Sequence, residues 1–255
     1  MNTDDPKWTD AMFVKEAEFV GAALAVVNRF LAVYRDKDKD SLGRPAFHVI
    51  ELVEADLTDI QIVVSDETGN RFGEFATHRV GPQTVMSFGQ AISRPDDVVN
   101  GIRDALASNT PIPLERELVM SAWNHIWRNQ LRLAVIEGNA AFESFVSSAL
   151  STAFPSVSIS ERTELSSKLQ LIDSELAKEA AANGKAFSPW FSAGQQGWKA
   201  LANPELNAWY SECYDLRNKV IHRGYTQVTR PEATKSVQTA VAAINHITSE
   251  VLRIR

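Results

Sequence analysis

The chain has 255 residues, with 26 basic and 32 acidic side chains and a formal net charge of −6. Hydrophobic residues make up 44% of the chain and charged residues 23%, a composition that is typical of a globular protein and excludes a disordered one. The negative net charge also argues against a protein that binds nucleic acid over its whole surface.

The first residues favour a cytoplasmic protein without membrane contact. They are acidic, whereas a secretory signal begins with basic residues. We also find no apolar run that approaches the roughly 18 residues of a membrane helix.

Two prolines, Pro111 and Pro113, interrupt the periodic patterns on either side and divide the chain into two predicted domains, residues 1–110 and 113–255. The acidic charge is concentrated in the first part, because residues 1–112 hold 11 basic and 18 acidic side chains, a net charge of −7. That part shows no catalytic pattern. We therefore expect a first domain of unknown role that regulates or binds a partner.

The first domain is predicted to be α+β. Apolar residues from Phe13 to Tyr34 recur in steps of three and four and predict a long helix, followed by a solvated connector at residues 36–40. Short apolar segments then predict a small, mostly antiparallel sheet. These segments are residues 46–53, 60–64, 71–76 and 84–88. Asp96 and Asp97 after a proline predict the start of a closing helix.

The second domain is predicted to be an all-α bundle. Apolar residues at helical spacing run from Leu114 to about Leu150, with an interruption expected near Gly138, and continue in a helix from Ser160. Asn203 before a proline predicts the start of a third helix, and Gly224 predicts its end. Thr229 and Glu232 have the spacing of a capping box that starts the last helix.

The third helix of this domain carries the most informative pattern of the chain. Arg217 offers a rigid, permanently charged fork for a phosphate, and His222 can move a proton near neutral pH. Residues 214–235 hold five basic and two acidic side chains, so the pattern lies in a basic region. Together these features suggest chemistry on a phosphodiester, for which we assign no metal and no cofactor.

Arg217 is unusual because it falls near the middle of the apolar stripe of its helix at about 100° per residue. A buried guanidinium is costly unless it is paired, so we expect a carboxylate partner, a cleft or a subunit interface. Glu137 and Glu143 interrupt the apolar pattern of the first long helix and are the candidate partners. Asn218 and His222 are four residues apart and share a face beside the stripe.

Cys213, the only cysteine, lies on the same apolar stripe. No disulfide can form within the chain. Its place favours a buried structural thiol over a nucleophile.

The spacing alone also permits a purely structural interpretation of the pattern. Arg217 would then form a salt bridge, Asn218 would bond a neighbouring helix, and His222 would interact with the helix dipole. Lys219 and Arg223 fit two roles equally well, because they could bind flanking phosphates of RNA or form an ordinary solvated face.

The run Leu216–Gly224, which follows the helical segment Leu131–Glu143 in an all-α domain, resembles the HEPN superfamily (higher eukaryotes and prokaryotes nucleotide-binding). The resemblance covers roughly residues 113–255. It implies a bundle of four or five helices with an Arg-x4–6-His motif, in which Arg217 and His222 match the catalytic pair and Asn218 the polar residue after the arginine.

Many members of that family are metal-independent endoribonucleases of toxin–antitoxin or anti-phage systems. The resemblance implies that two copies dimerise around one cleft and cut RNA, and that an antitoxin or sensor protein is a further partner. His222 would act as general base or acid, Arg217 would stabilise charge on the phosphoryl oxygens, and Asn218 would orient the histidine or the phosphate. Some family toxins carry a modified tyrosine two residues after the histidine, whereas Tyr225 lies three residues after His222.

Two other functions fit the same residues. One is a non-catalytic HEPN-like module that keeps the motif for dimerisation or nucleotide binding. The other is a regulatory protein that contacts its partner through the acidic first domain.

Overall fold

A computed structural model describes residues 6–46, 51–57, 59–65, 67–78, 94–155, 159, 164–194 and 197–255. The chain forms two compact units. Unit 1 comprises Met1–Lys37 and Val49–Thr110, and unit 2 comprises Asp38–His48 and Pro111–Arg255. Unit 2 therefore includes a loop that comes from the first part of the sequence.

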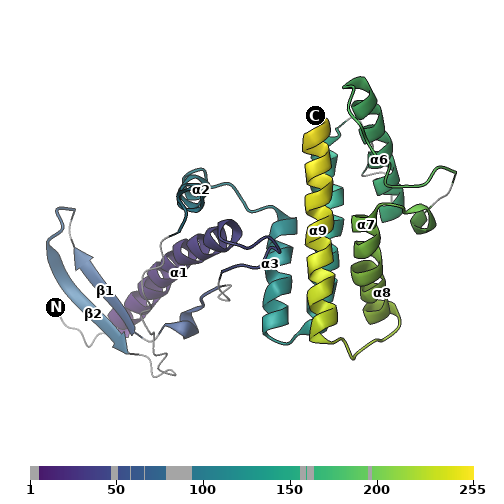
Figure 1. Ribbon diagram of the computed structural model, residues 1–255. Helices are drawn as coiled ribbons and strands as arrows, with labels where there is room; N and C mark the ends of the chain where they lie inside the picture. Colours follow the sequence, from purple (N-terminus) through teal and green to yellow (C-terminus); the bar gives the residue numbers. More distant parts are fainter. Residues whose placement is uncertain are drawn as a thin grey trace. The chain divides into compact units, whose positions relative to one another are not determined.

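The described part of unit 1 contains two α-helices and one hairpin. Helix α1 spans Pro6–Lys37 and helix α2 spans Asp96–Ala107, and a short 3-10 turn, η1, spans Glu54–Asp56. Strand β1, Asp59–Ser65, pairs antiparallel with strand β2, Arg71–His78 (Figure 1). The predicted start of the closing helix is confirmed, since α2 begins at Asp96 directly after Pro95.

The prediction of an α+β first domain is wrong. Helices make up most of the described chain, and its only strands are the two of this hairpin, which do not form a sheet that a domain could be built on. Residues 51–53, expected to end a strand, are irregular and lead into η1, while residues 84–88 lie outside the described part. Short apolar runs do not distinguish a strand from other structure, which explains the error.

Helix α1 is more exposed than its apolar stripe predicts. Val20 and Val33 are buried, but Phe19 is 62% and Val26 is 71% exposed. The segment Ala17–Lys37 is long and apolar enough to cross a membrane by length and composition, contrary to our expectation that no run reaches that length. The cytoplasmic location stays a prediction.

The charged run at residues 36–40 is not simply a solvated connector. Asp36 is buried at the end of α1, and the loop of unit 2 begins at Asp38. Trp123 Nε1 donates a hydrogen bond of 3.1 Å to the carbonyl of Leu42. Gly43 follows with a φ of +72°, and a Cβ there would lie 3.1 Å from Val119. The loop therefore belongs to the packing of unit 2.

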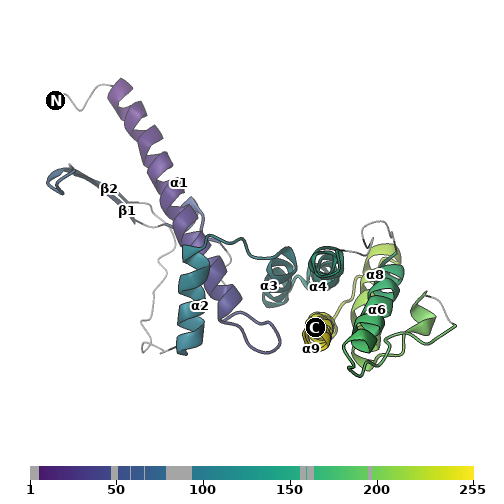
Figure 2. The ribbon, with the colours of Figure 1, turned by 90° about the horizontal axis from the view of Figure 1, so that it is seen from above.

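Helices form all the regular structure described in unit 2. In chain order they are α3 (Leu114–Trp127), α4 (Leu131–Ser144), the π turn η2 (Phe145–Ala149), α5 (Leu150–Ala153), α6 (Leu165–Ala182), the 3-10 turn η4 (Gly197–Ala200), α7 (Pro204–Trp209), the π turn η5 (Tyr210–Tyr214), α8 (Asp215–His222) and α9 (Arg230–Ile254). Helix α4 lies between α3 and α8, and α9 packs along it (Figure 2). This arrangement is a helical bundle.

The predicted interruption of the first long helix is real but misplaced. The break lies at residues 128–130, where Asn129 has a φ of +58°. Gly138 instead lies inside α4, where a Cβ would come within 3.2 Å of Val237 on α9. The glycine therefore permits close packing of two helices and does not end one.

The helix ends agree with the predicted caps. The Asn203 side chain accepts a hydrogen bond of 3.0 Å from Leu206 N, and Thr229 and Glu232 form the capping box of α9. Gly224 follows α8 with a φ of +65°. These ends fix where the motif helix starts and stops.

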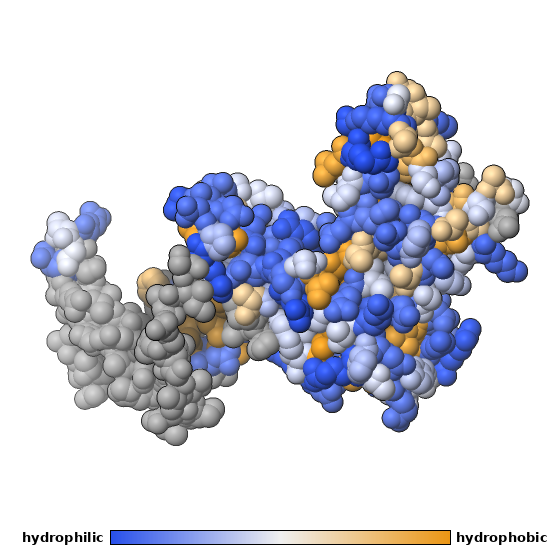
Figure 3. Space-filling model, viewed as in Figure 1, coloured by the Kyte–Doolittle hydropathy of each residue, from blue (hydrophilic) through white to orange (hydrophobic). Residues whose placement is uncertain are grey.

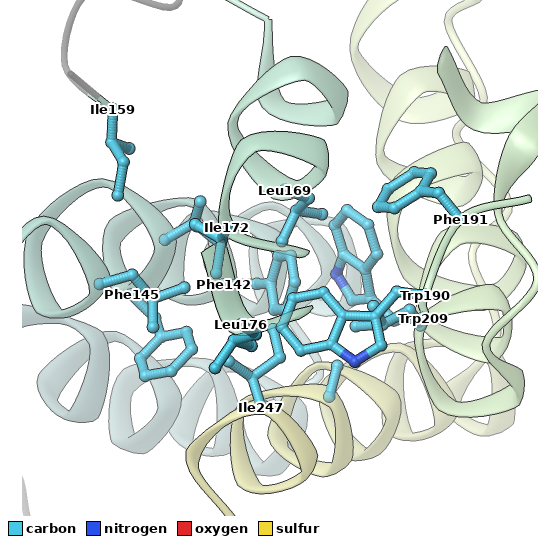
Figure 4. Packing of buried hydrophobic residues seen from close by; sticks show 14 of the residues in the cluster. Phe142, Phe145, Ile159, Leu169, Ile172, Leu176, Trp190, Phe191, Trp209 and Ile247 are labelled. Carbon is cyan, nitrogen blue, oxygen red and sulfur yellow. The ribbon is translucent and has the colours of Figure 1, made fainter. Parts of the chain in front are cut away.

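The larger core of unit 2 lies where α4, α6, α7 and α9 meet (Figure 4). The rings of Phe142 and Trp209 stack with centroids 4.0 Å apart, and both side chains are fully buried. On the face of unit 2 that Figure 3 shows, hydrophobic residues lie in separate patches among hydrophilic ones. Most of the large apolar side chains of this unit are therefore packed in its interior.

Replacing the centre of this core should destabilise unit 2 strongly. We expect Phe142→Ala to lower the free energy of unfolding by about 3–5 kcal/mol, because it removes a buried ring and leaves a cavity. Leu133→Ala on the same helix is the control, since Leu133 is 45% exposed and its removal should cost under about 0.5 kcal/mol. Equal losses in denaturant titrations of the two variants would contradict this assignment of the core.

Candidate functional site

The helix that carries the motif is not a regular α-helix. It begins as α7 at Pro204, widens into the π turn η5 at Tyr210–Tyr214 and continues as α8 to His222. A π turn holds one residue more than an α turn. Cys213 and Leu216 of the predicted apolar stripe are nevertheless buried, and Arg217 next to them is half-buried.

Arg217 is half-buried and lines a pocket of about 560 Å3. The pocket is also lined by Glu143, Ser147, Glu164, Lys168, Trp198 and Tyr214. These residues come from α4, η2, α6, η4 and η5 and from the segment before α6. The volume lies within the range of about 300–1,000 Å3 that is usual for ligand sites.

The guanidinium of Arg217 is held by its neighbour in sequence. Arg217 Nη1 donates a hydrogen bond of 3.0 Å to Asn218 Oδ1. Within the described part of the chain, Arg217 has no carboxylate partner in an ion pair. Most of its five N–H donors therefore remain for a ligand in the pocket.

The two carboxylates that we expected to pair with Arg217 have other partners. Glu137 Oε1 lies 3.2 Å from His125 Nε2. Glu143 lines the same pocket as Arg217, but its Oε1 accepts a hydrogen bond of 2.8 Å from Asn139 Nδ2. Glu143 thus lines the same pocket as Arg217 without forming an ion pair with it, and Glu137 belongs to a different contact.

His222 lies apart from this pocket. It is the last residue of α8, its side chain is exposed, and it makes no hydrogen bond or ion pair with any residue that the structure describes. The structure thus brings Arg217 and Asn218 together and leaves His222 outside the pocket that Arg217 lines.

The other two basic residues of the motif differ in their surroundings. Lys219 Nζ forms an ion pair of 2.8 Å with Asp215, which raises the pKa of the lysine. Arg223 is exposed beyond the end of α8. The pairing of Lys219 favours the solvated-face interpretation for that residue, whereas both interpretations of Arg223 stay open.

A second π turn borders the same pocket. This turn is η2, Phe145–Ala149, and its residue Ser147 lines the pocket together with residues of the motif helix. π turns inside helices occur frequently at functional sites, because they shift the side chains that follow them. Two such turns at one pocket support its assignment as the candidate site.

Of the residues that line the pocket, only Glu143 and Arg217 were predicted as site residues from the sequence, and those that were missed include Lys168, Trp198 and Tyr214. Tyr214 precedes Arg217 by three residues and so shares its helix face, which was a usable signal. Trp198 follows Gly194 and Gly197 in a loop-like segment, where a large aromatic residue is unusual. Lys168 gave no signal, because it is an ordinary charged residue of an amphipathic helix.

Comparisons with protein-family models, curated proteins and solved structures find no match to this chain. Among the described residues, no group of three or more histidine, cysteine, aspartate and glutamate side chains could hold a metal ion. The motif residues and the pocket that Arg217 lines are therefore the features that point to a function.

Cys213 should be chemically inert in the folded protein. Its side chain is fully buried, and burial raises the pKa of its thiol to about 12. We expect no reaction with a disulfide reagent such as DTNB at pH 8 and one reacting thiol after unfolding in guanidinium chloride. Rapid reaction of the folded protein would contradict the buried, structural role.

Proposed function

We propose that unit 2 is a metal-independent endoribonuclease of the HEPN type. The observation that carries the proposal is that Arg217 directs a guanidinium without a carboxylate partner, among the described residues, into a pocket of about 560 Å3. A half-buried guanidinium is costly unless an anion accepts its hydrogen bonds, and a phosphate suits its planar fork. An RNA phosphodiester supplies that anion.

The proposed reaction is attack of a ribose 2′-hydroxyl on the adjacent phosphorus, which breaks the bond to the 5′-oxygen of the next nucleotide. Arg217 stabilises the negative charge that develops on the phosphoryl oxygens. Asn218 holds the guanidinium of Arg217 through their hydrogen bond of 3.0 Å, so its role is to position the arginine. One histidine removes the proton of the 2′-hydroxyl, and an acid protonates the leaving oxygen.

The exposed position of His222 makes a second copy of the chain part of this proposal. In one chain His222 does not line the pocket of Arg217. A homodimer with facing motif helices would bring the histidine of one copy to the phosphate held by the arginine of the other. A toxin–antitoxin or anti-phage setting, with an antitoxin or sensor as partner, follows from the family resemblance alone.

The second candidate function is nucleotide binding without cleavage. It is favoured by the separation of His222 from the Arg217 pocket, since a binding site needs only the cationic and polar groups of the pocket. In that case the motif would serve recognition, and the protein would act as a scaffold or regulator.

Cleavage assays on matched variants distinguish the two functions. We expect wild-type protein to cut total RNA in EDTA and both Arg217→Ala and His222→Ala to abolish cleavage. Lys235→Ala, which removes a positive charge from an exposed site on α9, should cleave normally. An inert wild-type protein in the absence of any inhibitor would contradict the nuclease proposal.

The same variants should remain folded. His222 is exposed, so His222→Ala should change the free energy of unfolding by under about 0.5 kcal/mol. Arg217→Ala removes one hydrogen bond and no ion pair, so its cost should be about 0.5–1.5 kcal/mol. Denaturant titrations check both values, and strong destabilisation by His222→Ala would support the structural interpretation of that residue.

The dimer makes a further prediction. Light scattering at micromolar concentration should give the mass of two chains, because each Arg217 needs a histidine from a second copy. Arg217→Ala and His222→Ala proteins, each inactive alone, should regain part of the activity when they are mixed, since a mixed dimer contains one intact pair of Arg217 and His222. Full activity of a strictly monomeric protein would contradict this arrangement.

A further inference from the structure

One wall of the Arg217 pocket is aromatic. The ring of Trp198 lies 5.1 Å from the ring of Tyr214, 5.1 Å from that of Tyr210 and 5.5 Å from that of Trp209, measured between centroids. Trp209 is fully buried, whereas Trp198 and Tyr214 are half-buried and line the pocket. Trp198 is thus held by three neighbouring aromatic rings, one of which is fully buried, while part of its own side chain remains exposed.

The same pocket contains a second cation beside Arg217. Lys168 of α6 donates a hydrogen bond of 2.9 Å from Nζ to Ser147 Oγ of η2, and it has no carboxylate partner among the described residues. Ser147 also lines the pocket, so the lysine is directed along its wall. Two cations from different helices therefore share one pocket with two aromatic rings.

Two carboxylates limit the kind of ligand that this pocket accepts. Glu143 and Glu164 line it together with Arg217 and Lys168, so the four charges cancel. A simple phosphate would be attracted by the cations and repelled by the carboxylates. A ligand that also presents N–H donors would satisfy the carboxylate oxygens, because an ionised carboxylate only accepts hydrogen bonds.

A nucleotide combines all of these features, with a flat π face, N–H donors on the base edge and an anionic phosphate. We infer that Trp198 and Tyr214 form a base-stacking subsite for one unpaired nucleobase of single-stranded RNA, whose phosphate is bound by Arg217 and Lys168. This inference rests on the proposed function, since RNA is its proposed substrate. Protein aromatic rings commonly stack unpaired bases of single-stranded nucleic acid.

The proposed subsite would select single strands. A base in a duplex is covered on both faces by its neighbours and cannot lie on Trp198 without leaving the stack. In the proposed complex, the nucleobase on Trp198 is the one next to the phosphate that Arg217 binds. The aromatic wall therefore positions substrate, while the reacting groups remain those of the motif.

Binding of a cleavage-resistant probe tests the subsite separately from cleavage. The probe is a fluorescein-labelled, single-stranded 2′-O-methyl oligonucleotide, which lacks the attacking hydroxyl, and fluorescence anisotropy measures its affinity for the full chain. Trp198→Ala should weaken binding about tenfold or more, the effect typical of losing one stacked base. Trp198→Phe keeps a ring and should remain within about threefold of wild type.

Two lysine variants on α6 supply the matched control. Lys168→Ala should weaken binding severalfold and lower its dependence on salt, because one phosphate contact is lost. Lys178→Ala removes a lysine of the same helix that does not line the pocket, and it should bind as wild type does. Lys168 is partly exposed, so this pair remains informative even if Trp198→Ala fails to fold.

The outcomes separate the subsite from the nuclease. Wild-type affinity of a folded Trp198→Ala protein, or equal affinities of the two lysine variants, would overturn the subsite while RNA cleavage by wild type still supported the nuclease. An inert wild type whose oligonucleotide binding depends on Trp198 and Lys168 would overturn the nuclease and support the subsite. Competition by inorganic phosphate as effective as competition by a mononucleotide would also overturn the subsite.

Discussion

The stack of Phe142 on Trp209 is the contact on which the candidate site depends. The two rings lie 4.0 Å apart in the core and join α4 to α7. Phe142 lies shortly before the π turn η2, and Trp209 lies directly before the π turn η5. Trp209 also contacts Trp198 and Tyr214, so the aromatic wall of the pocket is built outward from this buried pair. A change in the packing of these two rings would therefore also change the geometry of the pocket.

Arg217 lies next to the buried face of its helix and still lines a pocket. Cys213 and Leu216 of the same helix are buried, whereas Arg217 is half-buried. A guanidinium in the apolar interior would need a carboxylate partner. The π turn η5 directly precedes α8, and its last residue, Tyr214, lines the same pocket as Arg217.

The sequence predicts those features of the fold that depend on residues close together in the chain. The caps at Asn203 and Thr229 were predictable because a short polar side chain at a helix start bonds the next turn. Arg217 was noticeable as a charge among apolar residues. The pocket was not predictable, because Lys168 and Trp198 lie far from Arg217 in the sequence and meet it only through packing. The π turns have no sequence signature, and the expected sheet failed because short apolar runs do not specify strands.

The most direct test of this account is a crystal structure of the protein with a single-stranded 2′-O-methyl oligonucleotide. The account predicts a phosphate on the guanidinium of Arg217, the adjacent base on Trp198, and His222 from a second copy facing the same phosphate. An oligonucleotide bound elsewhere, with Arg217 still bonded only to Asn218, would contradict the account.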